Sequence, residues 1–250
     1  MTAAVLLIGG MDSSAGAGLL RDAATVARAG LPSRVAVTAV TAQTDAGVGA
    51  LHPVPADVVR AQIASAAASG PVAAVKIGML GEAVIADTVA HTIAGLLPAA
   101  PVVLDPVLRA SSGRPLLDAA GLAVMIRKLL PRSSLVTPNL PELQHLGRAF
   151  GLGEGAEEAE VAQALLGQGC AAVLVKGGHG ADPARSTDRL YRDGATVETF
   201  AAPRHPFALR GTGCQMASAI AAALAQGQSL EDAVARAKAA VAERFRLAAC

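Results

Sequence analysis

Residues 209–227 read LRGTGCQMASAIAAALAQG, a turn bracketed by two glycines that runs into an alanine-rich segment. Glycine lets the backbone turn tightly and alanine favours helix, so unpaired N–H groups should converge where the helix begins. Such a helix start binds anions, and it would also stabilise the thiolate of Cys214 in the first turn. Because short glycine motifs also occur by chance, a small-residue helix packed closely in a core explains the pattern equally well.

Length and charge restrict the kinds of protein that this can be. At 250 residues the chain suits one α/β domain or two small ones, and we expect a single domain over residues 1–250. The 21 Lys and Arg residues nearly balance the 20 Asp and Glu residues, for a net charge of +1. No basic surface is therefore expected to attract nucleic acid or an anionic membrane, and any anion must be bound locally.

The high hydrophobic content, 52% of the chain, does not indicate a membrane protein. Much of it is alanine, and the apolar runs end well before the roughly 20 residues that a bilayer requires. The N-terminus lacks a basic segment and reads directly into a predicted strand, so we expect a cytoplasmic protein without a signal peptide. Cys170, Cys214 and Cys250 are widely separated and the histidines show no H-x-x-x-H spacing, so neither a disulfide framework nor a structural metal is expected.

Short β-branched runs alternate with longer segments of helical period, which is typical of βα units on a mostly parallel sheet. The strands lack polar alternation, as expected for a sheet that is covered on both faces. The Asp193-Gly194 dipeptide between two strand-like runs within residues 189–200 predicts an antiparallel edge hairpin. The expected strands are residues 5–8, 35–41, 72–77, 102–105, 135–137 and 172–176; the expected helices are residues 18–28, 56–68, 82–96, 116–129, 142–150, 157–167, 213–224 and 230–245.

The last of these helices is the most clearly amphipathic. Ser229 can cap it, and apolar residues from Leu230 to Phe245 form one stripe. We expect the charged residues to form its solvated outer face. They are Arg236, Lys238, Glu243, Arg244 and Arg246.

Polar side chains recur at the carboxyl ends of the predicted strands, where open α/β sheets bind their ligands. So many functional groups at one edge favour a single binding cleft. The segments are GGMDSSAGAG at residues 9–18, TAQTD at 41–45, KIGMLG at 76–81, DPV at 105–107, TPNLPE at 137–142 and KGGH at 176–179.

Two glycine patterns resemble part of a dinucleotide-binding fingerprint but fail at its third position. Arg21 in GAGLLR and Met216 in GTGCQM stand where Gly or Ala is needed for close helix–strand packing. These failures disfavour a nicotinamide oxidoreductase. No G-x-x-x-x-G-K-[ST] loop is present either, so a nucleotide kinase with a different phosphate loop remains.

Several strand-end residues suit phosphate and metal chemistry. Asp105 can present a carboxylate to hydrated Mg²⁺, because Pro106 fixes the turn after it. Lys176 ends an apolar strand, so its ammonium would lie over the cleft and contact phosphate oxygens. Asn139 and Glu142 lie one helical turn apart and can face one point. If the pair is considered alone, a structural role explains it more simply: Asn139 would cap a helix, and Glu142 would interact favourably with the dipole of that helix in its first turn.

Three further residues suit the binding of a polar ring. Asp22 and Gln43 can pair with the edge of a heterocycle, or can serve as helix-entry and turn residues. Met79 can place its thioether over a flat ring, although methionine more often fills a core.

Together, these motifs resemble those of the hydroxymethylpyrimidine/phosphomethylpyrimidine kinases of thiamine biosynthesis, within the ribokinase-like superfamily. The likeness runs from GGMDSSAGAG at residues 9–18 to GTGC at residues 211–214, and it is specific because seven motifs occur in the right order. It implies a three-layer α/β/α ribokinase-like fold with a mostly parallel sheet. It also implies ATP- and Mg²⁺-dependent phosphorylation of 4-amino-5-hydroxymethyl-2-methylpyrimidine, and then of its monophosphate to the diphosphate.

The resemblance also implies roles for individual residues. The turn Gly211-Thr212-Gly213-Cys214 would form a catalytic anion hole, with Cys214 where sugar kinases of the superfamily have a catalytic Asp. Asp105 and Glu142 would hold Mg²⁺, partly through water. The pyrimidine pocket would be lined by Gly10, Asp22, Gln43, Met79 and Val107; ATP would contact Asp105, Asn139, Lys176, Gly211 and Gly213.

Three departures from the family pattern bear on the substrate more than on the fold. Arg210 stands where the family commonly has His, and it could strengthen phosphate binding or alter a lid around residues 180–188. Ser13-Ser14-Ala15-Gly16 replaces Pro-Ser-Gly-Gly, which is expected to add bulk near the substrate. The chain also stops at Cys250 without the glycine-rich tail that many members carry.

Two alternative functions remain open on this reading. A pyridoxal (B6 vitamer) kinase has the same fold, and some relatives with Gly-Thr-Gly-Cys accept that ring. A non-catalytic pyrimidine-binding regulator would need a defective phosphate apparatus, yet Lys176, Asn139, Glu142 and Cys214 are all present. Because relatives are often dimers, a homodimer is expected.

Overall fold

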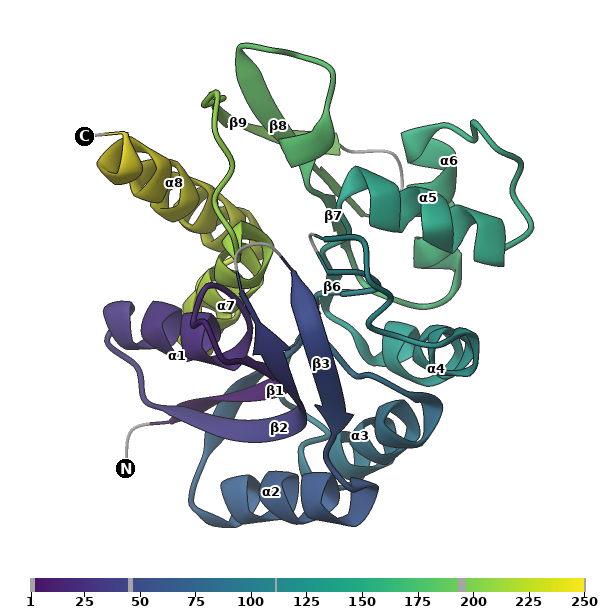
Figure 1. Ribbon diagram of the computed structural model, residues 1–250, viewed down its shortest axis with the longest axis vertical. Helices are drawn as coiled ribbons and strands as arrows, with labels where there is room; N and C mark the ends of the chain where they lie inside the picture. The colour runs from purple at the N-terminus through teal and green to yellow at the C-terminus, as the bar shows by residue number, and fades with distance from the viewer. Residues whose placement is uncertain (1–2, 45–46, 111, 193–196, 250) are drawn as a thin grey trace.

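The computed structural model describes residues 3–44, 47–110, 112–192 and 197–249 (Figure 1). Across these residues the strands form one mostly parallel sheet, with antiparallel pairing at both edges. In spatial order the strands are β3 (Val48–Pro53), β2 (Ser33–Gln43), β1 (Ala4–Asp12), β4 (Val72–Ile77), β5 (Val102–Leu104), β6 (Leu135–Val136), β7 (Val173–Val175), β8 (Arg185–Tyr191) and β9 (Val197–Pro203).

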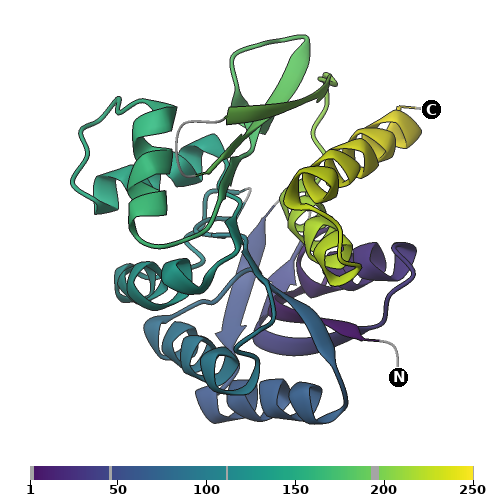
Figure 2. The same cartoon turned by 180° about the vertical axis from the view of Figure 1, so that it is seen from behind.

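Helices cover both faces of the sheet, which makes three layers (Figures 1 and 2). One face carries α2 (Ala56–Ala68), α3 (Ala83–Leu96), α4 (Ala119–Val124), α5 (Leu140–Ala149) and α6 (Glu158–Gly167); the other carries α1 (Gly18–Arg28), α7 (Thr212–Ala225) and α8 (Leu230–Ala248). In β1, Leu6 and Ile8 pack toward the first set of helices, and Val5 and Leu7 toward the second. Burial on both faces explains the uninterrupted apolar strands. No helix in the described ranges is long and apolar enough to cross a membrane.

All of the predicted strands and helices are present, with ends that differ by a few residues. The predicted antiparallel hairpin corresponds to β8 and β9, and its Asp193-Gly194 turn lies outside the described residues. The helix expected at residues 116–129 begins only at Ala119, because Asp118 caps it, and it continues as a π-helical turn over Met125–Leu129. Strand β3 was missed because it lies at an edge and is only partly buried, so it has no continuous apolar run.

The prediction that the charged residues of α8 form a solvated outer face is partly wrong. Lys238 is buried, with its Nζ 2.9 Å from the Asp188 Oδ1. Arg244 donates to the Gln215 side chain and, over 2.7 Å, to the Arg210 carbonyl. Because α8 packs against both α7 and β9, these two cations point inward and tie the helix to the carboxyl edge of the sheet.

Candidate active site

Two adjoining cavities open at the carboxyl ends of the parallel strands. The small cavity, of about 260 Å³, lies between the ends of β1 and β4 and the start of α7. The large cavity, of about 980 Å³, extends from there between α5 and α8. We call their common wall the junction. Its residues are Arg109, Ala110, Asn139, Glu142, Lys176, Gly178, His179, Leu209, Thr212 and Gly213.

Every residue singled out from the sequence for a site role lines the small cavity, although the residues come from distant parts of the chain. The strand-end rule therefore identified one real cleft. These residues are Gly10, Asp22, Gln43, Met79, Asp105, Val107, Asn139, Glu142, Lys176, Gly211, Thr212, Gly213 and Cys214.

The glycine turn before α7 has the geometry that an anion site needs. Gly211 precedes the helix at φ +71°, and a Cβ there would lie 2.4 Å from the Gly16 carbonyl oxygen. Only glycine fits this left-handed position and this close backbone approach. No side chain caps the helix start, and the Lys176 Nζ lies 3.2 Å from where a Cβ of Gly213 would be. The first N–H groups of α7 and one ammonium group therefore converge at the junction.

Arg210, which we expected to strengthen phosphate binding or to alter a lid, lines the small cavity and forms an ion pair with Asp12. Its guanidinium lies 2.9 Å from the Asp12 Oδ2 and donates to the Ser14 Oγ at 2.9 Å. These two contacts connect the turn before α7 to the end of β1 and the loop that follows it. Residues 13–16, where we expected added bulk near the substrate, line neither cavity, although their neighbours Asp12 and Ala17 line the small one. The exposed Ala15 instead adopts φ +57°, a left-handed conformation that disfavours any residue with a Cβ.

Lys176 connects two carboxylates at the junction. Its Nζ lies 2.7 Å from the Asp105 Oδ1 and 3.9 Å from the Glu142 Oε2, and Thr137 also donates to Asp105. Burial alone would raise the pKa of Asp105, but the charges of Lys176 and Lys76 hold it below its ordinary value. Burial raises the pKa of Glu142 to about 7, and the charge of Asp105 adds to the effect.

Asn139 and Glu142 form the capping box that was the simpler explanation of their spacing. The Asn139 Oδ1 accepts from the Glu142 N–H, and the Glu142 Oε2 accepts from the Asn139 N–H, each at 2.8 Å. The same two side chains line both cavities, so the cap also fixes their positions at the junction.

Lys76 is a site residue to which the sequence reading gave no role. Its Nζ lies 2.7 Å from the Asp22 Oδ2, each side chain is 1% exposed, and Ser218 donates to the other oxygen of Asp22. Asp22 therefore belongs to a buried ion pair beneath the small cavity. Burial by itself lowers the pKa of Lys76, but the charge of Asp22, with a smaller effect from Asp105, outweighs it and keeps the lysine protonated. A lysine within an apolar strand was the available signal, since it requires a buried partner.

The expected stabilisation of the Cys214 thiolate is not found. Burial raises the pKa of the thiol to about 11, although the charge of Lys76 and a hydrogen bond from the Gly18 backbone act in the opposite direction. Desolvation of the charged form therefore outweighs the field of the helix start. At neutral pH the side chain is a thiol.

We expect Cys214 to react slowly with iodoacetamide at pH 7, on the order of 10²-fold more slowly than an ordinary cysteine, because only the thiolate reacts. Its rate should rise about tenfold per pH unit up to pH 10. Peptide mapping by mass spectrometry measures this rate at Cys214 itself. Cys214→Ala, which we expect to fold but to turn over slowly, identifies the peptide; a rate that levels off near pH 8 would contradict the raised pKa.

The two acidic residues beside Lys176, Asp105 and Glu142, suit a nucleotide-bound Mg²⁺ ion better than a permanent metal. The described part of the chain holds no group of three or more His, Cys, Asp and Glu side chains placed to bind a metal. Asp105 and Glu142 nevertheless face the same ammonium group. Mg²⁺ is typically held by one or two carboxylates together with substrate phosphates and water, so two carboxylates here fit that ion.

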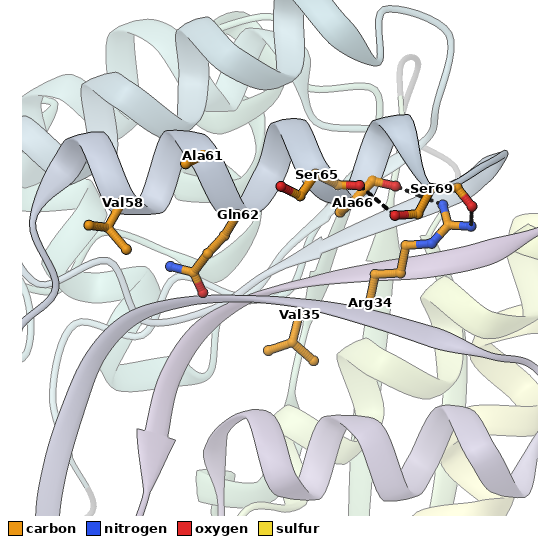
Figure 3. Close-up of a pocket in the computed structure, with 8 residues that line it drawn as sticks. All are labelled: Arg34, Val35, Val58, Ala61, Gln62, Ser65, Ala66 and Ser69. Carbon is orange, nitrogen blue, oxygen red and sulfur yellow. Dashed lines mark hydrogen bonds between the residues drawn. The ribbon is translucent and has the colours of Figure 1, made fainter.

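A third cavity, between β2 and α2, lacks comparable chemistry (Figure 3). It is a wide groove beside Val35 and Val58. Arg34 lies at one end and donates to four backbone carbonyls at the end of α2, among them Ala66 and Ser69. Because its one charged group is already bound to the backbone, the groove is not a candidate active site.

Comparison with known proteins assigns the chain to a family. The family model described as phosphomethylpyrimidine kinase matches residues 12–249. A hydroxymethylpyrimidine/phosphomethylpyrimidine kinase of Rhizobium meliloti is 42% identical over 242 residues, or 96% of this chain and 89% of the relative. The crystal structure of phosphomethylpyrimidine kinase from Clostridium difficile 630 has a TM-score of 0.82 at 29% identity, covering 97% of this chain and 99% of that one. Pyridoxal kinase from Staphylococcus aureus in complex with AMP-PCP has a TM-score of 0.85 at 33% identity, covering 97% and 87%. The chain belongs to the phosphomethylpyrimidine kinase family.

Proposed function

We propose that the whole chain, as one kinase domain, transfers the γ-phosphoryl group of ATP to 4-amino-5-hydroxymethyl-2-methylpyrimidine, and then to its monophosphate. The observation that carries the proposal is the junction, where Lys176 and two residues of the Gly211–Cys214 turn, Thr212 and Gly213, line both cavities. A transferring phosphoryl group needs positive charge and oriented N–H groups at one point between donor and acceptor. Relatives that carry this enzyme name support the same assignment.

The small cavity would bind the pyrimidine. A Cβ at Gly10 would lie 2.8 Å from the Met79 Sδ, so glycine there leaves room for the thioether to lie against a flat ring. Gln43 receives a hydrogen bond from Thr41 through its side-chain oxygen, which leaves its amide N–H groups to recognise a ring nitrogen. Val107 supplies an apolar edge, and Asp22 would shape the floor through its pair with Lys76.

The large cavity would bind ATP. His205, Phe207 and Phe245 form an aromatic group at its far side, with His205 and Phe245 stacked at 5.3 Å between ring centroids. Such rings offer a flat apolar surface to a purine. The triphosphate would then extend toward Asn139, Lys176, Gly211 and Gly213. The Staphylococcus aureus pyridoxal kinase, solved with AMP-PCP and with ADP, supports nucleotide use by this fold.

Mg²⁺ would be held at the junction by Asp105 and Glu142, partly through water, with Asn139 fixed beside them by the capping box. When bound, the ion neutralises charge on the nucleotide phosphates. Lys176 would move from Asp105 to the phosphate oxygens, since both are within reach of its flexible side chain.

The transfer requires positioning more than a strong base. The hydroxymethyl oxygen forms a bond to the γ-phosphorus while the bond to the β,γ-bridging oxygen breaks, and that electron pair stays on ADP. Because the transition state is loose, the hydroxyl proton leaves late, and it can pass to an oxygen of the transferred group. Cys214 would orient the hydroxyl group as a neutral thiol, and the Gly211–Cys214 turn would stabilise the charge on the phosphoryl oxygens.

We further propose that the protein is a homodimer with small-molecule substrates and no nucleic-acid partner. The near-neutral charge supports the second statement. Light scattering after size-exclusion chromatography measures the first: a mass of one chain at micromolar concentration would exclude the dimer.

Steady-state kinetics tests the proposed function. With Mg·ATP, the purified protein is expected to convert the hydroxymethylpyrimidine to the monophosphate and then to the diphosphate, each step followed by chromatography of the products. Pyridoxal serves as the rival acceptor alcohol. A kcat/KM at least tenfold higher for pyridoxal would instead assign the chain to B6 vitamers, and binding of the pyrimidine without any turnover would assign it to regulation.

A further inference from the structure

Two short arms, residues 107–110 and 112–116, form a hairpin that borders the junction from the side of β5. Its arms are joined by hydrogen bonds from the Ala110 N–H to the Arg114 carbonyl and from the Leu116 N–H to the Leu108 carbonyl. Arg114 donates to the carbonyls of Val48 and Gly49 in β3, both at 3.0 Å. The hairpin is therefore held at both its base and its side, and it follows directly after Asp105.

Arg109 is the charged residue of this hairpin that lines both cavities, and no role has been assigned to its side chain. Among the residues that the structure describes, its exposed guanidinium donates one hydrogen bond, to the Gly113 carbonyl at 3.1 Å. No carboxylate of the described residues lies within 4.0 Å of it. Its charge also helps to lower the pKa of His145, after burial and Arg148, which puts the guanidinium near the wall of the large cavity.

Arg109 differs from the other cations near the junction, because those cations are already paired with carboxylates. Lys176 is already paired with Asp105 and lies close to Glu142, so two carboxylates share one ammonium. Arg210 is paired with Asp12. A triphosphate that entered the junction would bring several negative charges next to these carboxylates. Arg109 is the guanidinium on this wall that can meet those charges without first breaking an ion pair among the described residues.

We propose that Arg109 is a further catalytic residue, whose guanidinium binds the β- and γ-phosphate oxygens of ATP across the junction and stabilises the transferring phosphoryl group. The proposal rests on the proposed function. Guanidinium presents several N–H donors in one plane and can contact two phosphate groups at once. As the bond from the γ-phosphorus to the bridging oxygen breaks, negative charge grows on ADP, where these donors lie. Arg109 takes up no proton and forms no bond in the step, so its contribution is electrostatic.

The test compares kcat for the wild type, Arg109→Ala, Arg109→Lys and Arg114→Ala, with saturating hydroxymethylpyrimidine and Mg·ATP. Arg109→Ala is expected to lower kcat about 10²-fold. Arg109→Lys should recover part of the loss, because it restores a charge without the planar donors. Added guanidinium ion at millimolar concentration should raise the kcat of Arg109→Ala but not that of the wild type.

Arg114→Ala is the matched control, since it removes a guanidinium from the same hairpin that lines neither cavity. Because the backbone hydrogen bonds between the arms remain and hold Arg109 in place, Arg114→Ala is expected to keep kcat within about threefold. A fall of less than about tenfold in Arg109→Ala, an equal fall in Arg114→Ala, or an absence of guanidinium rescue would each overturn the proposal. If the wild type itself does not phosphorylate the pyrimidine, the proposed function fails; if it does and Arg109→Ala matches it, only the role of Arg109 fails.

Discussion

Replacing Lys176 with methionine should lower kcat for pyrimidine phosphorylation by about 10²–10³-fold. The ammonium lies at the junction, 3.2 Å from the Cβ position of Gly213 in the anion turn. Methionine keeps much of the length of the side chain and removes its charge. The substitution also leaves Asp105 and Glu142 facing the incoming phosphates without their shared counter-ion. Steady-state kinetics at saturating substrates measures the effect.

Lys128→Met is the matched control, because Lys128 is paired with Asp87 at the surface and lines neither cavity. It should leave kcat within about twofold. Circular dichroism of Lys176→Met establishes whether it is folded, and Lys176→Met/Asp105→Asn provides a second variant without the unpaired carboxylate. If folded Lys176→Met kept more than about a tenth of the wild-type kcat, the anion site would be wrongly placed.

Replacing Lys76 with methionine should lower the free energy of unfolding by about 3–5 kcal/mol, because it leaves the Asp22 carboxylate buried without a counter-charge. Both side chains are 1% exposed and 2.7 Å apart. Urea unfolding, followed by circular dichroism, measures the loss.

A double-mutant cycle separates the ion pair from simple packing. Lys76→Met/Asp22→Asn removes both charges and keeps the Ser218 hydroxyl as a neighbour, so it should be more stable than Lys76→Met alone. If the double variant were as unstable as the sum of the single ones, the two charges would not be coupled, and Asp22 would not be held by Lys76.

The fold was predictable because its signals are local. Strands β1 and β4 are short apolar runs buried on both faces, and the helices that follow show helical period and recognisable ends. Strand β3 depended on its pairing with β2, and the start of α4 depended on capping by Asp118. The apolar pattern of the sequence encodes neither of these contacts.

That these residues line one cavity was predictable from the same logic, since strand ends at one edge of a parallel sheet must meet. Its electrostatics were not. The partner of Lys76 is Asp22, in another element, and no spacing rule joins them. The pKa of Cys214 depended on burial outweighing the helix start, and the role of Arg210 depended on its reaching Asp12 across the cleft. Contacts between distant segments decide which charges are free to bind a ligand.

The central claim is that phosphoryl transfer takes place at the junction between the two cavities. A crystal structure of the protein with the hydroxymethylpyrimidine, Mg²⁺ and a non-hydrolysable ATP analogue tests it most directly, through the distance from the acceptor hydroxyl oxygen to the γ-phosphorus. We predict a distance of about 3–3.5 Å, with the γ-phosphate on the Gly211–Cys214 turn and within hydrogen-bonding reach of Lys176. A γ-phosphate bound away from that turn, or a pyrimidine outside the small cavity, would contradict the account.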